Sequence, residues 1–266
     1  MSTRKKLGLA LGSGSFRGPA HIGVIKTLEK NNIPIDFLAG SSIGAFIAAH
    51  YAVFQDSQKL EADILGNKRE KISLLFDLSR SGGLLTGNRV ERLFREILGG
   101  AQFKDTKIPL KIIATDIRQG KSFIFQEGDL AKAIRASVSI PLTFKPVKFK
   151  DKLLIDGGAS NPVPDNVVKD MGADVVISVN LYNHHVFDDK NPNTSKVVMR
   201  GLEILLANLA KSGAKHTDIL LEPGVGGVYK GARLKKYYDQ KFITQIISDS
   251  EIMTQKRMEE IKLLLK

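Results

Sequence analysis

The sequence predicts an α/β fold in which helices cover both faces of a mainly parallel sheet. Two observations carry this prediction. Short segments rich in Ile, Val and Leu alternate along the chain with segments whose apolar residues recur at helical spacing. The short segments are largely apolar, as strands buried on both faces of a parallel sheet are. Open sheets of this class keep their functional sites at the carboxyl ends of the strands.

The elements can be assigned in order from the N-terminus. Leu7–Leu11 is predicted to be a strand, and a glycine-rich loop over residues 12–18 follows it directly. Pro19 suits the first turn of a helix, so a helix is expected over residues 19–30. Residues 43–53 are expected to form a largely buried helix. Further strands are predicted over residues 36–39, 110–115, 122–126, 153–155, 175–179 and 219–221.

Helical spacing also marks two segments outside this pattern. Between residues 56 and 107 the sequence has dense mixed charge, which indicates a helical insert that either covers the sheet or caps the site. Within it, Asn88 is expected to cap a helix whose third position is Glu91, a variant of the capping box. A second helix is expected over residues 196–211. The apolar faces are Val90, Leu93, Phe94, Ile97 and Leu98 in the first helix and Val198, Leu202, Leu205, Leu206 and Leu209 in the second.

Composition narrows the class of protein. The chain has 266 residues, which fits one large domain or two small ones. Because no segment reads as a linker between domains, we expect a single domain over residues 1–266. It has no cysteine, so a disulfide framework, a thiolate metal site and a cysteine nucleophile are excluded. The net charge of +12 favours polyanionic partners such as anionic membranes, nucleic acids or phosphorylated substrates. Because basic residues are spread along the chain and tryptophan is absent, specific nucleic-acid binding is disfavoured.

The sequence favours a cytoplasmic location. No segment approaches the ~20 apolar residues of a spanning helix, and the apolar stretch Leu7–Leu11 is shorter than the core of a secretory signal. Residues 229–266, with nine basic and five acidic side chains, are expected to be helical. Such a basic helix can lie on an anionic bilayer or pack on the protein core, and packing is favoured. Transient contact with an anionic membrane surface, peripheral to the membrane, stays open.

The sharpest motif is Gly-Ser-Ser-Ile-Gly at residues 40–44, which has the form G-x-S-x-G. It lies after a predicted strand and before a predicted helix, the context in which this motif presents a nucleophilic serine, here Ser42, on a tight turn. Gly40 and Gly44 remove side chains that would collide in such a turn, and the helix N-terminus adds partial positive charge. The alternative is a turn of small residues without a catalytic function.

The glycine-rich loop at residues 12–18 admits two interpretations. Its spacing is G-x-G-x-x-x-G, one residue longer than a dinucleotide-binding fingerprint, and no acidic residue ends the second predicted strand to bind a ribose. A loop of this kind can equally present backbone N–H groups to an oxyanion that forms beside a nucleophile. Because the motif at residues 40–44 follows the neighbouring strand, the loop fits acyl transfer better than nucleotide binding.

A serine nucleophile needs a base. His21 and His50 lie within predicted helices, and none of the five histidines stands in a turn that would orient it. The alternative base is Asp156, which directly follows a predicted strand and precedes Gly157 and Gly158. These glycines allow a tight turn that brings the carboxylate against another backbone segment. Taken alone, the same residues fit an ordinary β-turn.

Together, these motifs resemble the patatin-like phospholipase family in order and spacing. The resemblance rests on the loop at residues 12–18, with the Ala-His-Ile-Gly-Val that follows from Ala20, and on the motif at residues 40–44. Asp156 with its two glycines completes the pattern, which extends over residues 7–179. Further matches are Arg135-Ala136-Ser137, Ile140-Pro141, Pro146-Val147 and Asn161-Pro162-Val163-Pro164. The resemblance implies a three-layer α/β/α sandwich with a mainly parallel central sheet.

The same resemblance implies a serine hydrolase that cleaves lipid acyl esters with a Ser–Asp dyad. Ser42 corresponds to the nucleophile and Asp156 to the base that accepts its proton. The implied reaction is of the phospholipase A or lysophospholipase type, passes through an acyl-enzyme on Ser42, and needs no metal or cofactor. The oxyanion hole corresponds to backbone N–H groups of Gly12, Ser13, Gly14 and Ser15, and the supporting positions are Arg17, Gly18, Gly40, Gly44, Gly157 and Gly158.

Three of these residues carry further expectations. Ser13 stands where the family most often has glycine, and its side chain narrows the dihedral angles open to the loop. Arg17 can lock the loop by hydrogen bonds to backbone carbonyls or can bind a lipid phosphate, and the structural role is favoured. Because an aspartate of ordinary pKa is a poor base for a hydroxyl, burial is expected to raise the pKa of Asp156.

The same residues leave other functions open. A thioesterase or a transacylase would use the same dyad. A non-catalytic protein that binds a lipid or a regulatory partner on this fold is a further alternative, but it would have no need of Ser42, Asp156 and the glycine loop together.

Overall fold

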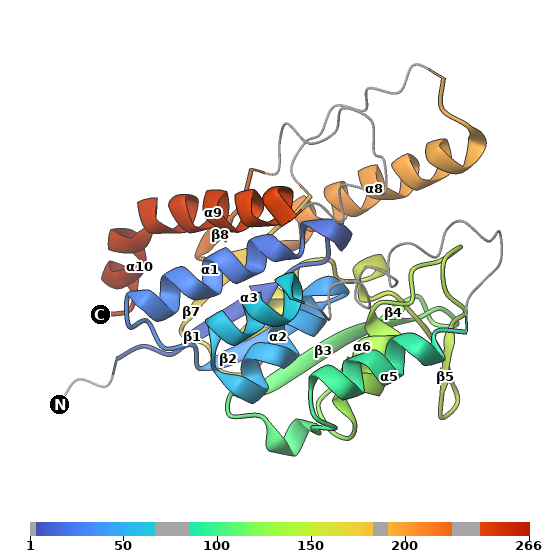
Figure 1. The fold of residues 1–266 in the computed structure, drawn as a ribbon, viewed down its shortest axis with the longest axis horizontal. Helices are drawn as coiled ribbons and strands as arrows, with labels where there is room; N and C mark the ends of the chain where they lie inside the picture. The colour runs from blue at the N-terminus through green and yellow to red at the C-terminus, as the bar shows by residue number, and fades with distance from the viewer. Residues whose placement is uncertain (1–3, 67–85, 183–190, 225–239) are drawn as a thin grey trace.

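The computed structural model describes residues 4–66, 86–182, 191–224 and 240–266 of the chain (Figure 1). An eight-stranded sheet lies at its centre, formed by β1 (Leu7–Leu11), β2 (Phe37–Ser41), β3 (Leu110–Asp116), β4 (Lys121–Phe125), β5 (Val147–Phe149), β6 (Lys152–Ile155), β7 (Val175–Val179) and β8 (Ile219–Leu221). Seven strands follow the order β5-β6-β3-β2-β1-β7-β8, and β4 pairs with β3. The pairs among β3, β2, β1, β7 and β8 are parallel, whereas β4, β5 and β6 pair in antiparallel fashion.

The register of the central strands brings their carboxyl ends to one edge of the sheet. Leu11 at the end of β1 is paired with Gly40 of β2 on one side and with Val179 of β7 on the other. The turns that follow these three strands therefore start at the same level. A functional site assembled from those turns is the arrangement expected for an open α/β sheet.

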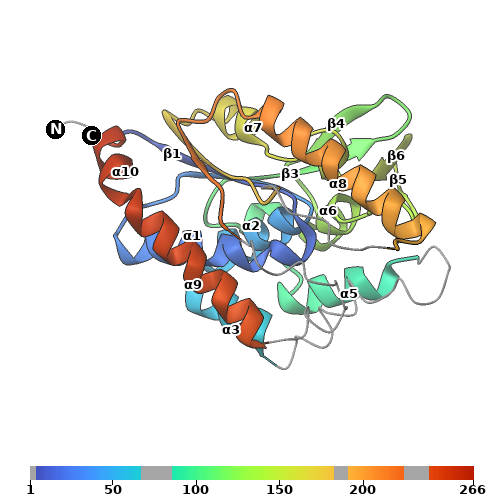
Figure 2. The ribbon, with the colours of Figure 1, turned by 90° about the horizontal axis from the view of Figure 1, so that it is seen from above.

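Helices cover both faces of the sheet (Figure 2). They are α1 (Pro19–Lys30), α2 (Ile43–Phe54), α3 (Ser57–Leu65), α5 (Asn88–Ile97), α6 (Leu130–Ser137), α7 (Asp165–Asp170), α8 (Thr194–Gly213), α9 (Gln240–Lys256) and α10 (Met258–Leu264). Successive residues of β1 point to opposite faces, as strand geometry requires. Leu9 belongs to the large core shared with α1, α2, α5, α6 and α9, whereas Ala10 belongs to a smaller core shared with α7. The predicted three-layer α/β/α sandwich is confirmed.

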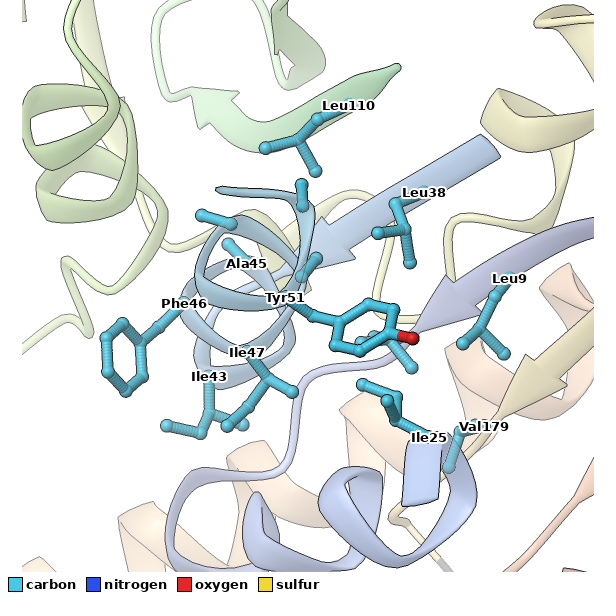
Figure 3. Close-up of a cluster of buried hydrophobic side chains, with 14 of the residues drawn as sticks. Leu9, Ile25, Leu38, Ile43, Ala45, Phe46, Ile47, Tyr51, Leu110 and Val179 are labelled. Carbon is cyan, nitrogen blue, oxygen red and sulfur yellow. The ribbon is translucent and has the colours of Figure 1, made fainter. Parts of the chain in front are cut away.

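Helix α2 is fixed on the sheet by a cluster of buried apolar side chains (Figure 3). Ile47 and Tyr51 of α2 lie in this cluster with Leu9 of β1, Leu38 of β2 and Ile25 of α1. Each of the five is less than a tenth exposed. Because α2 is packed in this way, the turn that precedes it is held in a fixed position at the end of β2.

Most of the predicted strands are confirmed, with shifts of one or two residues at their ends. The prediction of β4 as a buried parallel strand is wrong, because β4 runs antiparallel to β3 and exposes Lys121, Ser122 and Ile124. A connection as short as the one from Asp116 to Lys121 can join antiparallel strands but is too short for a parallel crossover. The parallel direction predicted for β6 is also wrong, because β6 pairs antiparallel with both β3 and β5. Strand β5 was not predicted, since its three residues are too few to show a pattern.

The expected cap of α5 is also corrected. Asn88 is the first residue of the helix rather than its cap, and Gly87 precedes it with φ 74°. A Cβ at Gly87 would collide with the guanidinium of Arg135, so both the positive φ and the lack of space favour glycine there. The predicted apolar face is buried as expected and consists of Val90, Leu93, Phe94, Ile97 and Leu98.

The described part of the predicted insert at residues 56–107 covers the sheet. Leu60 of α3 and Phe94 of α5 are both buried in the core on the α2 side. Residues 67–85, which belong to the same segment, lie outside the described residues. Of the two interpretations, covering the sheet holds for α3 and α5.

The C-terminal region packs on the core where the structure describes it. Helix α9 lies along α1 and buries an apolar stripe that consists of Ile243, Ile246 and Ile247. The favoured interpretation of the basic region at residues 229–266 therefore holds for α9, while residues 229–239 lie outside the described residues. Within the described ranges, no helix is both long enough and apolar enough to cross a membrane.

Helix α8 departs from its prediction. The predicted apolar face is only partly covered, because Val198 is 43% exposed and Leu205 is 65% exposed. Leu206, Ala207 and Ala210 pack in a cluster with Tyr182. Helical spacing shows that a helix has an apolar face, but it does not show what covers that face.

Candidate active site

Ser42 stands in the turn between β2 and α2, at the carboxyl end of the second strand. Its backbone has φ 54° and ψ −122°, outside the regions that L-residues favour. A conformation of this kind persists only where the surroundings impose it, and such residues cluster at functional sites. The strained strand-to-helix turn is the geometry that presents a nucleophilic serine in G-x-S-x-G enzymes.

Gly40 and Gly44 allow the chain to pass through this turn. A Cβ on Gly44 would collide with the carbonyl oxygen of Leu11 at the end of β1. A Cβ on Gly40 would collide with the carbonyl oxygen of Gly44 itself. The first turn of α2 therefore lies in direct contact with the end of β1, which places Ser42 beside the glycine-rich loop.

Asp156 follows β6 and begins the short helical turn η4 (Gly157–Ala159). Its Oδ2 accepts a hydrogen bond of 2.6 Å from Ser42 Oγ, and its Oδ1 accepts one of 2.8 Å from the N–H of Gly158. Gly157 lies so close to the carbonyl oxygen of Ile113 that a Cβ would collide with it. The fold thus joins two side chains that are 114 residues apart in the sequence.

Burial changes the acidity of this carboxyl group. It raises the pKa of Asp156 from an ordinary 3.8 to about 6, although the hydrogen bonds from Ser42 and Gly158 act to lower it. The expectation of a raised pKa is confirmed. A carboxyl group with a pKa near 6 is still ionised at neutral pH and is a stronger base than a surface aspartate. It is therefore suited to accept the proton of a hydroxyl.

The glycine-rich loop starts with two backbone donors that are already engaged. The N–H of Gly12 donates to the carbonyl oxygen of Val179 at 3.0 Å. The N–H of Ser13 donates to the carbonyl oxygen of Pro162 at 2.8 Å. These two of the four predicted oxyanion donors stabilise the loop itself.

The next two donors of the loop are available. Among the described residues, the N–H groups of Gly14 and Ser15 have no hydrogen-bond partner. The same is true of the N–H of Ile43, which directly follows Ser42 and starts α2. Gly18, at the end of the loop, lies against the side chain of Ile43. Unpaired backbone donors in the turn that carries a serine and in the loop that contacts this turn can stabilise an oxyanion.

Two side chains hold the loop in place, one from α1 and one from the loop itself. His21 Nε2 donates to the carbonyl oxygen of Gly12 at 2.8 Å, and burial lowers the pKa of His21 to about 4, which keeps the ring neutral at neutral pH. Arg17 is 2% exposed, pairs with Glu203 of α8 at 3.4 Å and lies over the ring of Phe16 at 4.7 Å. These contacts favour the structural role of Arg17 over binding of a lipid phosphate.

In the described part of the chain, no histidine forms a hydrogen bond with Ser42. His50 contacts Asp63 of α3 at 2.9 Å, and His216 lies exposed before β8. Residues 184–185, the other two histidines, lie outside the described residues. Within the same ranges, no three His, Asp or Glu side chains are grouped as metal ligands.

Two hydroxyl groups that the sequence did not indicate support the hydrogen-bonded pair of Ser42 and Asp156. Ser137 Oγ accepts a hydrogen bond of 2.8 Å from the N–H of Ser42 and donates one of 2.6 Å to the carbonyl oxygen of Ile113. Thr115 Oγ1 donates to the carbonyl oxygen of Asp156 at 2.8 Å. Ser137 belongs to one of the family-like segments noted above, which was the available signal. No motif marks Thr115.

Tyr182 also borders the site without a motif to indicate it. Its ring packs against Val163 and Ala210. Burial raises the pKa of its phenol, the Ser13 side chain lowers it, and the charge of Asp156 raises it further. The phenol therefore lies within electrostatic reach of Asp156 and beside Ser13, the residue at which the loop departs from the family pattern.

Comparison with protein families gives a match over most of the chain. Residues 9–167 match the model of the patatin-like phospholipase family. This range includes the glycine-rich loop, Ser42 and Asp156.

Several curated proteins are similar to the chain. An uncharacterized NTE family protein of Mycobacterium tuberculosis is 36% identical over 180 residues, which cover 68% of this chain and 50% of that protein. Patatin-like phospholipase domain-containing protein 6 of Homo sapiens is 31% identical over 185 residues, covering 67% of this chain and 14% of that protein. Lysophospholipase NTE1 of Pyricularia oryzae is 30% identical over 205 residues, which cover 74% of this chain and 13% of that protein. The chain spans half the length of these relatives or less.

Two solved structures share the fold. VipD from Legionella pneumophila superposes with a TM-score of 0.58 over 97% of this chain and 67% of that one, at 13% sequence identity. The type III effector protein ExoU superposes with a TM-score of 0.54 over 96% of this chain and 53% of that one, also at 13% identity. At such low identity the likeness supports the fold alone.

Proposed function

Because the chain belongs to the patatin-like phospholipase family, we propose that it hydrolyses lipid acyl esters with Ser42 as nucleophile and Asp156 as base. The observation that carries this proposal is the 2.6 Å hydrogen bond from Ser42 Oγ to Asp156 Oδ2, made by a serine on a strained turn. The proposed substrates are phospholipids or lysophospholipids, whose acyl esters are the bonds that the family description implies.

In the first step, Ser42 Oγ attacks the carbonyl carbon of the ester. Its proton passes along the existing hydrogen bond to Asp156 Oδ2, one of the two oxygens of the carboxylate. The second oxygen of Asp156 keeps its hydrogen bond to Gly158 throughout, so the carboxyl group does not have to turn. A base that is already aligned removes the need for reorganisation during the reaction.

The negative charge that develops on the carbonyl oxygen needs donors in place. The N–H groups of Gly14 and Ser15 are the proposed donors from the loop, and the N–H of Ile43 is a third at the start of α2. Gly12 and Ser13 serve in a different way, because their own N–H groups hold the loop to the neighbouring backbone. Donors aimed at a developing oxyanion are often the largest single contribution to catalysis.

The intermediate then collapses in two stages. Protonated Asp156 returns its proton to the leaving alkoxide, which leaves the acyl group as an ester on Ser42. A water molecule attacks this ester while Asp156 accepts one of its protons. Collapse of the second intermediate returns that proton to Ser42 Oγ and releases the carboxylic acid, so both residues regain their starting states.

The proposal is tested with a fluorophosphonate probe, which labels activated serines. Labelling of the wild type is expected to disappear in Ser42→Ala and to fall sharply in Asp156→Asn. Ser41→Ala is the matched control, because Ser41 is the neighbouring buried serine and its hydroxyl has no hydrogen-bond partner among the described residues. This control should label as the wild type does.

The opposite result has a definite meaning. A folded wild-type protein that is not labelled, in detergent micelles as well as in buffer, would contradict the proposal. It would favour a non-catalytic protein that binds a lipid or another partner on the same fold. If the wild type is labelled, assays with phospholipid, lysophospholipid and thioester substrates separate the proposed activity from that of a thioesterase.

A further inference from the structure

Most of the exposed large apolar side chains belong to three segments of the chain. Among the described residues, ten large apolar side chains are exposed, and eight of them belong to the β3–β4 hairpin, the loop before β5 or α8. The eight are Ile117, Ile124, Leu142, Val197, Val198, Met199, Ile204 and Leu205, whereas Ile252 and Leu263 lie in α9 and α10. Exposed apolar residues concentrated in a few segments indicate an interaction surface more often than singly scattered ones do.

Leu142 is exposed by a loop that is held firmly in place. It is 63% exposed and has φ 69°, an uncommon conformation for a leucine. On one side of it, the carbonyl oxygen of Ser139 accepts a hydrogen bond of 3.0 Å from the N–H of Asp156. On the other side, Arg135 donates to the carbonyl oxygen of Lys145 at 3.1 Å. The surroundings therefore impose a strained backbone that turns an apolar side chain outward, in a segment that is hydrogen-bonded to the backbone of the proposed base.

Basic side chains lie next to Leu142 and Ile117. Residues 142–152 contain four lysines and one aspartate, and residues 117–121 contain two basic residues and no acidic one. We call this surface the basic rim. It consists of the exposed residues Ile117, Arg118, Lys121, Leu142, Lys145, Lys148 and Lys150.

Hydrogen bonds join the parts of the basic rim into one surface. The N–H of Ile117 donates to the carbonyl oxygen of Leu153 at 3.0 Å, and the guanidinium of Arg118 donates to the carbonyl oxygen of Asp151 at 3.2 Å. Both views of the ribbon place the β3–β4 and β5–β6 turns and the N-terminal end of α8 at the same end of the molecule (Figures 1 and 2). This is the end toward which β1 and β2 run, and hence the end that carries Ser42.

The chemistry of the basic rim fits an anionic lipid bilayer. Lysine and arginine side chains are attracted to anionic head groups, and exposed apolar side chains beside them can enter the acyl region. A nucleic acid would be attracted by the same charges, but it would leave Leu142 and Ile117 without a favourable contact.

We propose that the basic rim docks this protein on anionic membrane surfaces, with Leu142 inserted into the bilayer and the carboxyl end of the sheet turned toward it. The proposal rests on the proposed function, because a lipid ester held in a bilayer has to reach Ser42. Docking through the basic rim would bring the substrate to the end of the sheet at which Ser42 and Asp156 meet. The apolar residues of α8 at this end would add contact area.

The test measures binding to vesicles of phosphatidylcholine with or without phosphatidylglycerol, using Ser42→Ala as the background so that no lipid is consumed. Combined substitution of Lys145, Lys148 and Lys150 by Gln is expected to weaken binding to the anionic vesicles roughly 100-fold at low salt. The control is a triple variant in which three exposed lysines elsewhere are replaced by Gln: Lys30 of α1, Lys104 of η3 (Phe103–Asp105) and Lys256 of α9. It removes the same charge but should weaken binding far less.

A second variant tests the apolar contact. Leu142→Asn introduces a residue that tolerates a positive φ, so the loop should retain its conformation. Because the apolar side chain is lost, binding to the anionic vesicles is expected to weaken roughly 10-fold. Leu263→Asn is the control, since Leu263 is 67% exposed in α10. It should leave vesicle binding unchanged.

The readouts separate this proposal from the proposed function. Rim variants that retain Ser42 should hydrolyse a short soluble ester at the wild-type rate. Their binding to vesicles is measured separately, in the Ser42→Ala background, without any turnover. Equal binding by the rim and control triples would overturn the proposal, as would binding that does not depend on phosphatidylglycerol. Retention on duplex DNA in place of anionic vesicles would also overturn it, because it would assign the basic rim to a different polyanion.

Discussion

The candidate active site and the contact between α1 and α9 both bring backbone segments very close together. At the site, a Cβ on Gly44 would collide with the carbonyl oxygen of Leu11. Between α1 and α9, a Cβ on Gly23 would collide with the carbonyl oxygen of Ile247. In the second region, buried polar groups are hydroxyls with partners, such as Ser250, which donates to a carbonyl oxygen of α1 at 2.7 Å.

The two regions differ in their contribution to the stability of the folded state. The site buries Asp156, whose pKa is raised to about 6, and it holds Ser15 and Ser42 at φ 53° and 54°. The contact between α1 and α9 consists of apolar packing with ion pairs at its border, such as Lys26 with Glu251 at 2.7 Å. Apolar packing is sufficient to explain the contact between α1 and α9. The candidate active site is arranged against stability, which is typical of a functional site.

The largest effect is expected for Asp156→Asn. Asparagine can still accept a hydrogen bond from Ser42 but cannot take its proton, so kcat/KM for a soluble ester should fall roughly 10³–10⁴-fold. Glu251→Gln, which removes a carboxylate from the other region, should change kcat/KM less than about twofold. Steady-state kinetics of both variants check this. Nearly normal hydrolysis by Asp156→Asn would remove the functional reason for the buried carboxyl group.

The next effect concerns the two close contacts. Gly44→Ala and Gly23→Ala each force a methyl group against a carbonyl oxygen, so each should lower the free energy of unfolding by about 2–4 kcal/mol. Only Gly44→Ala should also reduce activity per folded molecule, because it displaces the turn that carries Ser42. Urea unfolding combined with active-site titration measures both quantities. If Gly23→Ala lost activity per folded molecule as well, the two regions would be coupled.

The pKa of Asp156 predicts opposite pH trends for activity and stability. Below about pH 6 the base is protonated, so kcat/KM should fall about tenfold for each pH unit. The free energy of unfolding should instead fall as the pH rises. The unfolded chain releases this proton near pH 3.9 and the folded protein only near pH 6, so the free energy of unfolding should drop by about 3 kcal/mol as the pH rises between these values.

Asp156→Asn provides the control for that trend. It lacks the titrating group, so the difference in unfolding free energy between wild type and variant should change between pH 4 and 6 and stay constant above pH 7. Urea unfolding at a series of pH values checks this. A constant difference over the whole range would mean that the carboxyl group is not buried in solution.

The smallest changes in stability and kcat are expected for the substitution of two buried serines, Ser137 and Ser250. Ser137→Ala leaves the N–H of Ser42 and the carbonyl oxygen of Ile113 without their partner, which should cost about 1–3 kcal/mol and reduce kcat roughly 10-fold. Ser250→Ala, in α9, should cost about 1 kcal/mol with no change in kcat. Thermal unfolding and initial rates measure the pair. An unchanged kcat in Ser137→Ala would show that the turn is held without this hydroxyl.

The sequence by itself determined the features that depend on local chain geometry. The strand–turn–helix order around Ser42 follows from apolar runs that end in glycine, and the loop at residues 12–18 follows from the same signal after β1. The alternation of strands and helices was sufficient for the fold class, because it leaves few ways to bury both faces of a sheet. The boundaries of β4 were nearly right, but its direction depended on its partner strand.

Only the tertiary structure decided which distant groups meet. It joined Ser42 to Asp156 and to Ser137, and it showed that Gly12 and Ser13 use their N–H groups within the fold while Gly14 and Ser15 do not. It also covered the apolar face of α9 and left part of that of α8 exposed. Spacing along a chain shows that a face or a turn exists, whereas hydrogen bonds, burial and the pKa of a carboxyl group depend on segments that lie a hundred residues away.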